Sequence, residues 1–111
     1  MLTSSKKAKG KKLQNLAAEK IREAYNLSDK DVTSTIMGDS GIDIKLSEEA
    51  RKKFGWAVEC KNLARIAIYK YWNQAKANAE KEKLDPLLII KQNRSEPLVV
   101  LSLDKFMELI K

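Results

Sequence analysis

The stretch Phe54-Gly55-Trp56-Ala57-Val58-Glu59-Cys60-Lys61-Asn62 decides how the rest of the chain is interpreted. It predicts a β-strand, because a glycine opens it and apolar residues fill its middle. Side chains alternate between the two faces of a strand, so Val58 and Cys60 point one way. Glu59 and Lys61 share the opposite face, about 6–7 Å apart at a rise of ~3.3 Å per residue. This arrangement suits metal-assisted hydrolysis, because a carboxylate holds a hard cation while a lysine steers the attacking water.

A second candidate carboxylate lies upstream, in the stretch Met37-Gly38-Asp39-Ser40-Gly41-Ile42-Asp43-Ile44. Asp43 alternates with two isoleucines, so it also stands on the face opposite its apolar neighbours. If the two strands pair antiparallel, Asp43 and Glu59 converge on one metal ion. Asp39 is the alternative acid, with Asp43 then a turn residue, but strand alternation favours Asp43. The alternative for Lys61 is an ion pair with Glu59 on a solvated strand face.

Composition limits the chemistry that the chain can perform. It contains no histidine and one cysteine, which excludes catalytic triads, histidine-ligated zinc and an internal disulfide. An all-oxygen site favours Mg²⁺ or Mn²⁺ over zinc. The net charge of +7 points to a polyanionic partner, nucleic acid first, and the alternative is a basic protein without such a partner. No apolar run is long enough to cross a membrane and no signal peptide is evident, so we expect a cytoplasmic protein with no membrane partner.

The 111 residues are expected to form one domain with a modest core. Residues 1–10 are rich in lysine and predict a flexible basic tail, so the single domain spans residues 11–111. Apolar periodicity and turn residues predict, in chain order, helix 11–25, strands 32–37 and 42–46, a helical turn 47–54, strand 56–61, helix 67–83, strands 87–91 and 98–101, and a closing helix from residue 102. This α-β-β-α-β-α-β-β-α order predicts an α/β domain with a central mixed β-sheet flanked by helices. Helix 67–83 is expected to be a right-handed crossover between parallel strands.

Several helix residues are candidates for the site or for the core. Gln14 lies at the edge of the apolar stripe of the first helix and is better aimed at a site than Glu19, although a surface amide is the alternative. Gln74 flanks the stripe of helix 67–83. For Tyr71 and Trp72, core packing is preferred to stacking on bases. The apolar side chains of the closing helix are expected to point inward, namely Leu103, Phe106, Met107 and Ile110.

The carboxylates of the two strands, with the lysine two residues after the second, resemble the Asp…Glu-x-Lys skeleton of the PD-(D/E)XK nucleases. Over nearly its whole length the chain is similar to small phage-encoded nucleases related to archaeal-type Holliday-junction resolvases. The matching pieces are Lys9-Gly10, 37–43, Leu46-Ser47, Phe54, 59–62, Gln74-Ala75, Asn78-Ala79, Lys91, 93–97 and 103–106. The resemblance implies a restriction-endonuclease-like core.

The resemblance also implies a role for each matched residue of the site. Asp43 and Glu59 would be the metal-binding carboxylates, with the Cys60 carbonyl as a further ligand. Lys61 would be the catalytic lysine. Gln74 would be the helix amide that positions water or phosphate.

Two positions depart from the family pattern. Gln14 falls where resolvase-like relatives often carry a glutamate, and a neutral amide cannot add charge to a metal site. Ile42 replaces the proline of the motif's name, which has little chemical cost.

The function that the resemblance implies is a magnesium-dependent (or manganese-dependent) endonuclease that cuts DNA at branched junctions. Cutting a junction needs two active sites on symmetric strands, so a two-fold homodimer is expected. A phage-encoded enzyme would act in the host cell cytoplasm. The residues expected to contact nucleic acid are Lys9, Lys11, Lys12, Gln14, Lys91 and Arg94. The alternatives are a nicking or restriction-like nuclease on duplex DNA, a non-catalytic nucleic-acid-binding module and, for Lys91 and Arg94 alone, solvation of a hairpin.

Overall fold

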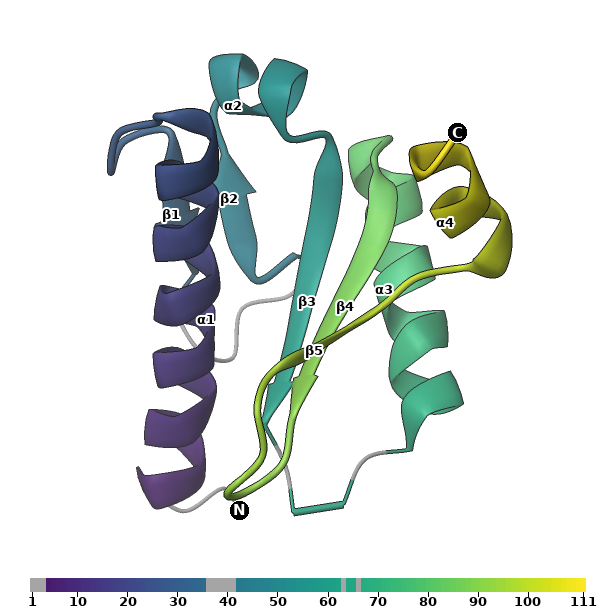
Figure 1. Ribbon diagram of the computed structural model, residues 1–111. Helices are drawn as coiled ribbons and strands as arrows, with labels where there is room; N and C mark the ends of the chain where they lie inside the picture. The colour runs from purple at the N-terminus through teal and green to yellow at the C-terminus, as the bar shows by residue number, and fades with distance from the viewer. Residues whose placement is uncertain (1–3, 36–41, 63, 66) are drawn as a thin grey trace.

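The computed structural model describes residues 4–35, 42–62, 64–65 and 67–111 (Figure 1). The elements are α1 (Ser4–Tyr25), β1 (Val32–Ser34), β2 (Ile44–Leu46), α2 (Glu48–Lys53), β3 (Trp56–Asn62), α3 (Ile68–Glu82), β4 (Asp85–Lys91), β5 (Leu98–Val100) and α4 (Leu103–Leu109). The predicted order of helices and strands is confirmed, and with it the α/β class. The predicted turn at 38–41 lies outside the described residues. No helix in the described ranges is long and apolar enough to cross a bilayer.

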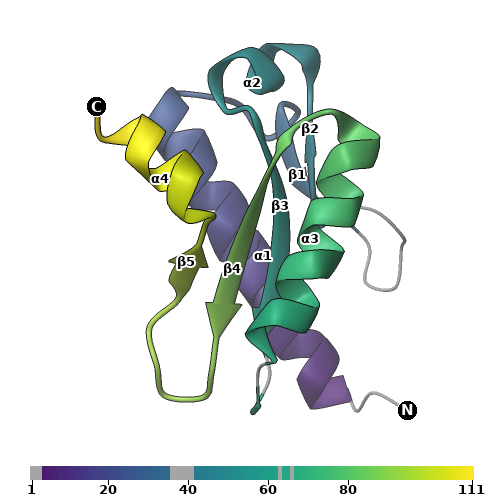
Figure 2. The ribbon, with the colours of Figure 1, turned by 90° about the vertical axis from the view of Figure 1, so that its right-hand side faces the viewer.

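Three strands form a mixed sheet in the order β3-β4-β5. β3 and β4 run parallel, with Glu59 opposite Leu88 and Cys60 opposite Ile89, and β5 returns antiparallel along β4. α3 connects the two parallel strands, as predicted for the crossover. β5 forms the outer edge of the sheet, and α4 follows it (Figure 2).

β1 and β2 form a separate antiparallel ladder, in which Val32 lies opposite Leu46. The chain passes along β2, through α2 and back down β3 (Figure 1). Among the described residues, one backbone hydrogen bond joins this ladder to the main sheet, from the Asp43 N–H to the Val58 carbonyl (3.0 Å). The antiparallel pairing considered for the Asp43 and Glu59 strands is therefore limited to this one bond. β2 begins only at Ile44, and its residues pair with β1 instead of β3.

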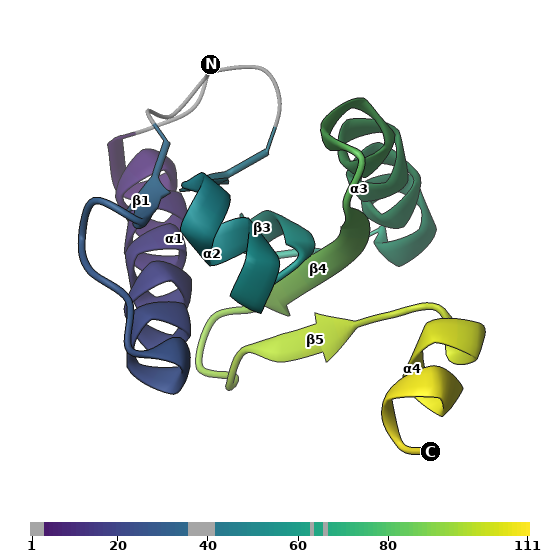
Figure 3. The same ribbon diagram turned by 90° about the horizontal axis from the view of Figure 1, so that it is seen from above.

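The main sheet separates two apolar cores, and α1 and α3 lie on its opposite sides (Figure 3). On the α1 side, Val58 and Cys60 pack with side chains of α1 and of the β1-β2 ladder. On the α3 side, Leu88 and Ile90 pack with Ala75. The alternation predicted along β3 is confirmed, since Val58 and Cys60 both face α1.

α1 begins at Ser4, earlier than predicted, so residues 4–10, which the sequence assigned to a flexible tail, are helical. Lysine and alanine favour helices, and this segment also makes tertiary contacts. Lys9 Nζ donates to Asn93 Oδ1 (2.9 Å), and the Lys9 carbonyl accepts from Asn62 Nδ2 (3.2 Å). Apolar periodicity missed this extension because its residues carry no apolar stripe.

α4 contradicts the predicted inward orientation of Leu103, Phe106, Met107 and Ile110. These side chains are between 48% and 74% exposed, and no residue of α4, which is described throughout, is buried. Lys105 is the least exposed residue of α4, and its Nζ donates to Asp85 Oδ2 on β4 (3.1 Å). The polar side of the helix therefore faces the sheet. An amphipathic pattern identifies two faces of a helix but not which one the fold covers.

Ser47 is the N-cap of α2 and fixes the start of this helix. Its Oγ accepts from the Ala50 N–H (3.1 Å) and donates to Asp31 Oδ1 (2.8 Å). The hydrogen bond from Ser47, followed by those from Ser28, lowers the pKa of Asp31. Ser47 thus joins α2 to the loop that precedes β1.

Replacing Ser47 by alanine is expected to lower the free energy of unfolding by about 1 kcal/mol, because the cap of α2 is lost. Urea denaturation measures this change. Ser95→Ala is the matched control, since Ser95 is exposed in the β4-β5 turn, and its effect should stay within about 0.5 kcal/mol. Equal losses in the two variants would contradict the role given to Ser47.

Candidate active site

Asp43 lies in a bend immediately before β2, where hydrogen bonds fix both its backbone and its side chain. Its N–H donates to the Val58 carbonyl (3.0 Å), and its own carbonyl accepts from the Thr35 N–H (2.8 Å). Its carboxylate Oδ2 accepts from the Cys60 N–H at 2.7 Å. The carboxylate is therefore held against β3, at the level of Glu59.

Glu59 is only 3% exposed, although it carries a carboxylate. Its neighbours Val58 and Cys60 belong to the core on the α1 side, so alternation places its side chain on the α3 side of the sheet. Its Oε2 is buried and has no hydrogen-bond partner among the described residues. Buried polar atoms are nearly always paired, and an oxygen of this kind suits a ligand to a cation.

Burial and mutual repulsion disfavour the charged forms of the two carboxylates. Burial, followed by the negative charge of Asp43, raises the pKa of Glu59 to about 7, while the charge of Lys61 opposes this rise. Burial also raises the pKa of Asp43, against the hydrogen bond from Cys60 and the charge of Lys61. Glu59 is therefore partly protonated near neutral pH.

Lys61 lies on the same face of β3, with its Nζ 5.0 Å from the centroid of the Tyr71 ring. Lys70 approaches the same ring at 5.8 Å. An aromatic face attracts an ammonium, so Tyr71 orients Lys61 beside the carboxylates. Tyr71 and Trp72 are partly buried against the α3-side core, as predicted. The sequence did not predict the contact with Lys61, because no periodic pattern relates residues on different elements.

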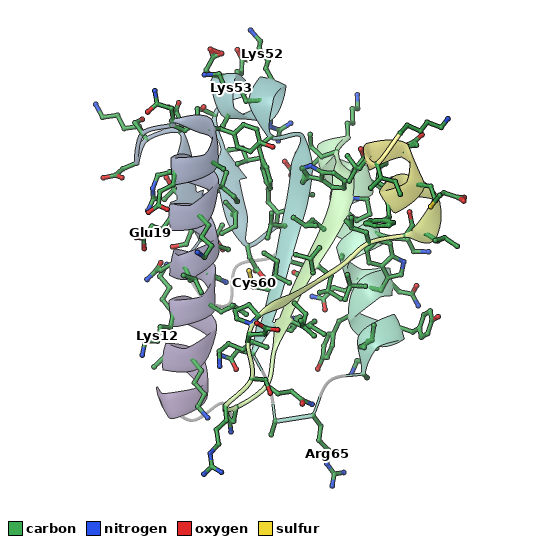
Figure 4. All side chains as sticks on the ribbon, viewed as in Figure 1. Lys12, Glu19, Lys52, Lys53, Cys60 and Arg65 are labelled. Atoms are coloured by element: carbon green, nitrogen blue, oxygen red, sulfur yellow. The ribbon has the colours of Figure 1, made fainter. Side chains whose placement is uncertain are left out.

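The residues of this site fit a divalent cation held by oxygen atoms. A dication would offset the repulsion between the carboxylates of Asp43 and Glu59 and pair with the free oxygen of Glu59. The described residues contain no cluster of three or more acidic, cysteine or histidine side chains, so further ligands would be carbonyl oxygens and water. The Cys60 thiol is not suited to this role, because it is buried on the α1 side (Figure 4) and burial raises its pKa. The Cys60 carbonyl stays the predicted ligand.

The two predicted glutamines have different surroundings. Gln14 is 3% exposed on α1, so it is not the surface amide that was its alternative. Gln74 is exposed on α3, and within the described residues no hydrogen bond joins it to the carboxylates or to the lysine. Glu19 is exposed, as predicted (Figure 4). The role of each glutamine stays a prediction, and Asp39 lies outside the described residues.

Four residues predicted to bind nucleic acid line one pocket of about 420 Å³, namely Lys9, Lys12, Lys91 and Arg94. The pocket lies where the first part of α1 meets the ends of β3 and β4 and the turn that follows β4. Asn62 also lines it, directly after Lys61, and in the described part of the chain its buried Oδ1 has no hydrogen-bond partner. Several cations around one hollow suit phosphate groups. The pocket therefore lies at the end of the strand that carries Glu59 and Lys61, on the α1 side of the sheet, whereas those two side chains point to the α3 side.

Lys11, also predicted to contact nucleic acid, is engaged within the protein. Its Nζ donates to Ser34 Oγ (2.8 Å) and to the Thr35 carbonyl (2.9 Å), and Ser34 Oγ donates to Asn15 Oδ1 (2.7 Å). These bonds tie α1 to the segment that leads toward Asp43. A phosphate contact from Lys11 would require its ammonium to leave both partners.

Replacing Glu59 by glutamine is expected to change how the stability of the metal-free protein depends on pH. Folding raises the Glu59 pKa from 4.5 to about 7, so its contribution to stability is full below 4.5 and is lost as the pH rises through 7. In chelator at about pH 8, Glu59→Gln should exceed the wild type by on the order of 2–3 kcal/mol in the free energy of unfolding. Urea denaturation at several pH values measures this difference.

Glu19→Gln is the control, since Glu19 is an exposed carboxylate on α1 and its loss should leave the pH profile unchanged. Mg²⁺ is expected to raise the free energy of unfolding of the wild type but not of Glu59→Gln. An advantage of Glu59→Gln that is the same at about pH 4 and about pH 8 would contradict the buried charge.

Comparison with known proteins places the chain in a family. The family model described as "Phage putative PDDEXK endonuclease" matches residues 5–111, a range that contains Asp43, Glu59 and Lys61. The chain matches no curated protein and no solved structure. The chain therefore belongs to the phage PDDEXK endonuclease family.

Proposed function

We propose that this protein is a metal-dependent endodeoxyribonuclease that hydrolyses phosphodiester bonds in DNA. The observation that carries the proposal is the buried Glu59 paired with the partly buried Asp43, next to Lys61. Metal-assisted hydrolysis of a phosphodiester requires these residue types within reach of one another. The basic pocket at the end of β3 supports a polyanionic substrate.

Asp43 and Glu59 would hold the metal, with the Cys60 carbonyl as a further ligand. A bound Mg²⁺ or Mn²⁺ would supply a water of lowered pKa and neutralise charge on the scissile phosphate. The backbone N–H of Cys60 keeps one oxygen of Asp43 in place. The pairing of β3 with β4 along its whole length fixes the backbone on either side of Glu59.

Lys61 would orient the attacking water or stabilise the negative charge that develops on the phosphoryl oxygens. The Tyr71 ring limits where the ammonium can go, because the contact between them favours one position beside the carboxylates. Gln74, exposed on α3, would contact the substrate directly. Gln14 is buried on α1, so a contact from its amide would require it to become accessible.

The basic pocket would hold the DNA backbone without reading bases. Lys9, Lys12, Lys91 and Arg94 offer point charges and one planar guanidinium to phosphates. Asn62 would contact a phosphate at the end of β3, on the face of the strand opposite Lys61.

We infer further that the substrate is branched DNA, such as a four-way junction, and that the active form is a homodimer. The support is the resemblance to archaeal-type Holliday-junction resolvases and the symmetry of the substrate, which requires two sites related by a two-fold axis. Within a phage-infected cell such an enzyme would act in the host cytoplasm.

Cleavage of a labelled four-way junction and of the matching linear duplex tests the function. With Mg²⁺ the wild type is expected to make paired nicks in the junction, and chelator should abolish them. Glu59→Gln should lower the rate by about 100- to 1,000-fold, because it removes one charge that the metal needs. Glu19→Gln is the control and should cleave like the wild type.

The other outcomes of this experiment would favour one of the alternative functions. Equal cutting of junction and duplex would support the nuclease and reject the branched substrate. Intact DNA with normal binding in every condition would reject the nuclease in favour of a binding module.

The basic pocket predicts how binding depends on salt. Lys12→Ala and Arg94→Ala are each expected to lower the slope of log affinity against log salt by about 1, because each removes one phosphate contact. Fluorescence anisotropy in chelator measures this slope without cleavage. Lys52→Ala is the control, because Lys52 is exposed on α2 at the opposite end of the molecule from Lys12 (Figure 4). Unchanged slopes in both pocket variants would place the DNA elsewhere.

A further inference from the structure

A large apolar surface on β5 and α4 lies open to solvent. Its members are each about half exposed or more, namely Leu98, Val99, Leu103, Phe106, Met107 and Ile110. At about 180 Å² for a fully exposed side chain of this size, they present on the order of 600 Å², the upper end of the roughly 300–600 Å² that the largest patch of a typical monomer presents. A surface of this size indicates a partner.

The orientation of α4 makes this surface unusual. Leu103, Phe106, Met107 and Ile110 follow the spacing of a helix face that normally packs on a core. Here that face points to solvent, while Lys105 on the other side binds Asp85. The described residues provide no cover for the apolar face, so its cover comes from another molecule.

An apolar groove of about 370 Å³ lies on the other side of β5, between this strand and α1. α1 lines it with Leu16, Ala24 and Tyr25, and β5 lines it with Leu98 and Val99. Leu16 and Tyr25 are more than one-third exposed, although they belong to the apolar stripe of α1. The apolar face of α4, with Leu103, Phe106, Met107 and Ile110, forms a ridge on one side of β5. The groove lies on the other side of the same strand.

We propose that α4 of each chain fills the α1-β5 groove of a second copy in a two-fold dimer. β5 lies between α1 and α4 (Figure 3). A two-fold axis parallel to β5 and outside this edge of the sheet brings β5 of the second copy alongside with its two sides exchanged, so each α4 faces the groove of the other copy. The contact is isologous, which closes the assembly at two chains.

Three observations favour a second copy as the occupant. The ridge and the groove are both apolar and belong to the same chain, so a single two-fold rotation can bury both surfaces in each copy. Their combined area approaches the roughly 800 Å² that each partner of a standard interface buries. Lys20 of the groove is opposite in charge to Asp104 and Glu108, which flank the apolar face of α4, although Glu96, which also lines the groove, is of like charge.

This dimer would supply the interface of the homodimer in the proposed function. Its biological role rests on that function, but its existence can be tested separately. Molecular mass in solution reports the interface without any cleavage. Loss of cleavage by a protein that still dimerises would count against the nuclease and not against the interface.

Sedimentation velocity over a concentration series tests the dimer. The wild type is expected to sediment as a dimer at the upper end of the series. Phe106→Glu on the ridge and Ala24→Glu in the groove should each weaken dimerisation by about 30-fold or more, the loss typical of an interface hot spot. Tyr69→Glu is the control, because Tyr69 is 82% exposed on α3 and its replacement should leave the dimer intact. Circular dichroism verifies that each variant is folded.

A mixing experiment tests the pairing of ridge with groove. Ala24→Glu and Phe106→Lys are each expected to be monomeric alone and to form a heterodimer when mixed, since one contact gains an opposite charge pair and the other is unaltered. A wild type that remains monomeric throughout the series overturns the proposal. Disruption by Phe106→Glu without disruption by Ala24→Glu would also overturn it, because the groove would then take no part.

Discussion

The hydrogen bond from the Cys60 N–H to the Asp43 carboxylate is the contact on which the site and the fold both depend. Together with the bond from the Asp43 N–H to Val58, it attaches the β1-β2 ladder to the main sheet. The same residue therefore completes the fold and supplies half of the acidic pair. A backbone N–H aimed at a carboxylate favours the charged form and partly offsets the burial that raises the pKa of Asp43.

The acidic pair opposes folding locally, and the rest of the molecule holds it in place. Glu59 lies on a strand that is paired along its length, and apolar cores lie on both sides of the sheet. Lys61 compensates only in part, because burial outweighs its charge in the pKa of Glu59. A dication would offset both carboxylates at once, which one ammonium beside an aromatic ring cannot do. The fold thus keeps two acids close together without neutralising them.

Local patterns were sufficient to predict the order of the elements and the two faces of β3. Alternation alone assigned Cys60 to the core and Glu59 to the opposite face, because a strand has only two faces. The partners of Lys11 and the contact between Lys61 and Tyr71 could not be predicted in this way. They join residues on different elements, and only the packing of those elements decides which side chains meet. The early start of α1 was missed for a related reason, since contacts with Asn62 and Asn93 support a segment that has no apolar stripe.

The wrong orientation predicted for α4 has a different cause. Its apolar spacing is that of a core helix, but a chain of 111 residues has few elements with which to cover both sides of its sheet. α1 covers the side of β3 that carries Val58 and Cys60, and its groove with β5 stays open. The edge strand and the helix that follows it therefore keep apolar surface that no described element of the same chain can bury. The periodicity correctly identified an apolar face of α4. The prediction that this face points inward assumed that the residues that cover it belong to the same chain. The same apolar spacing is equally compatible with burial of this face by a second copy of the chain.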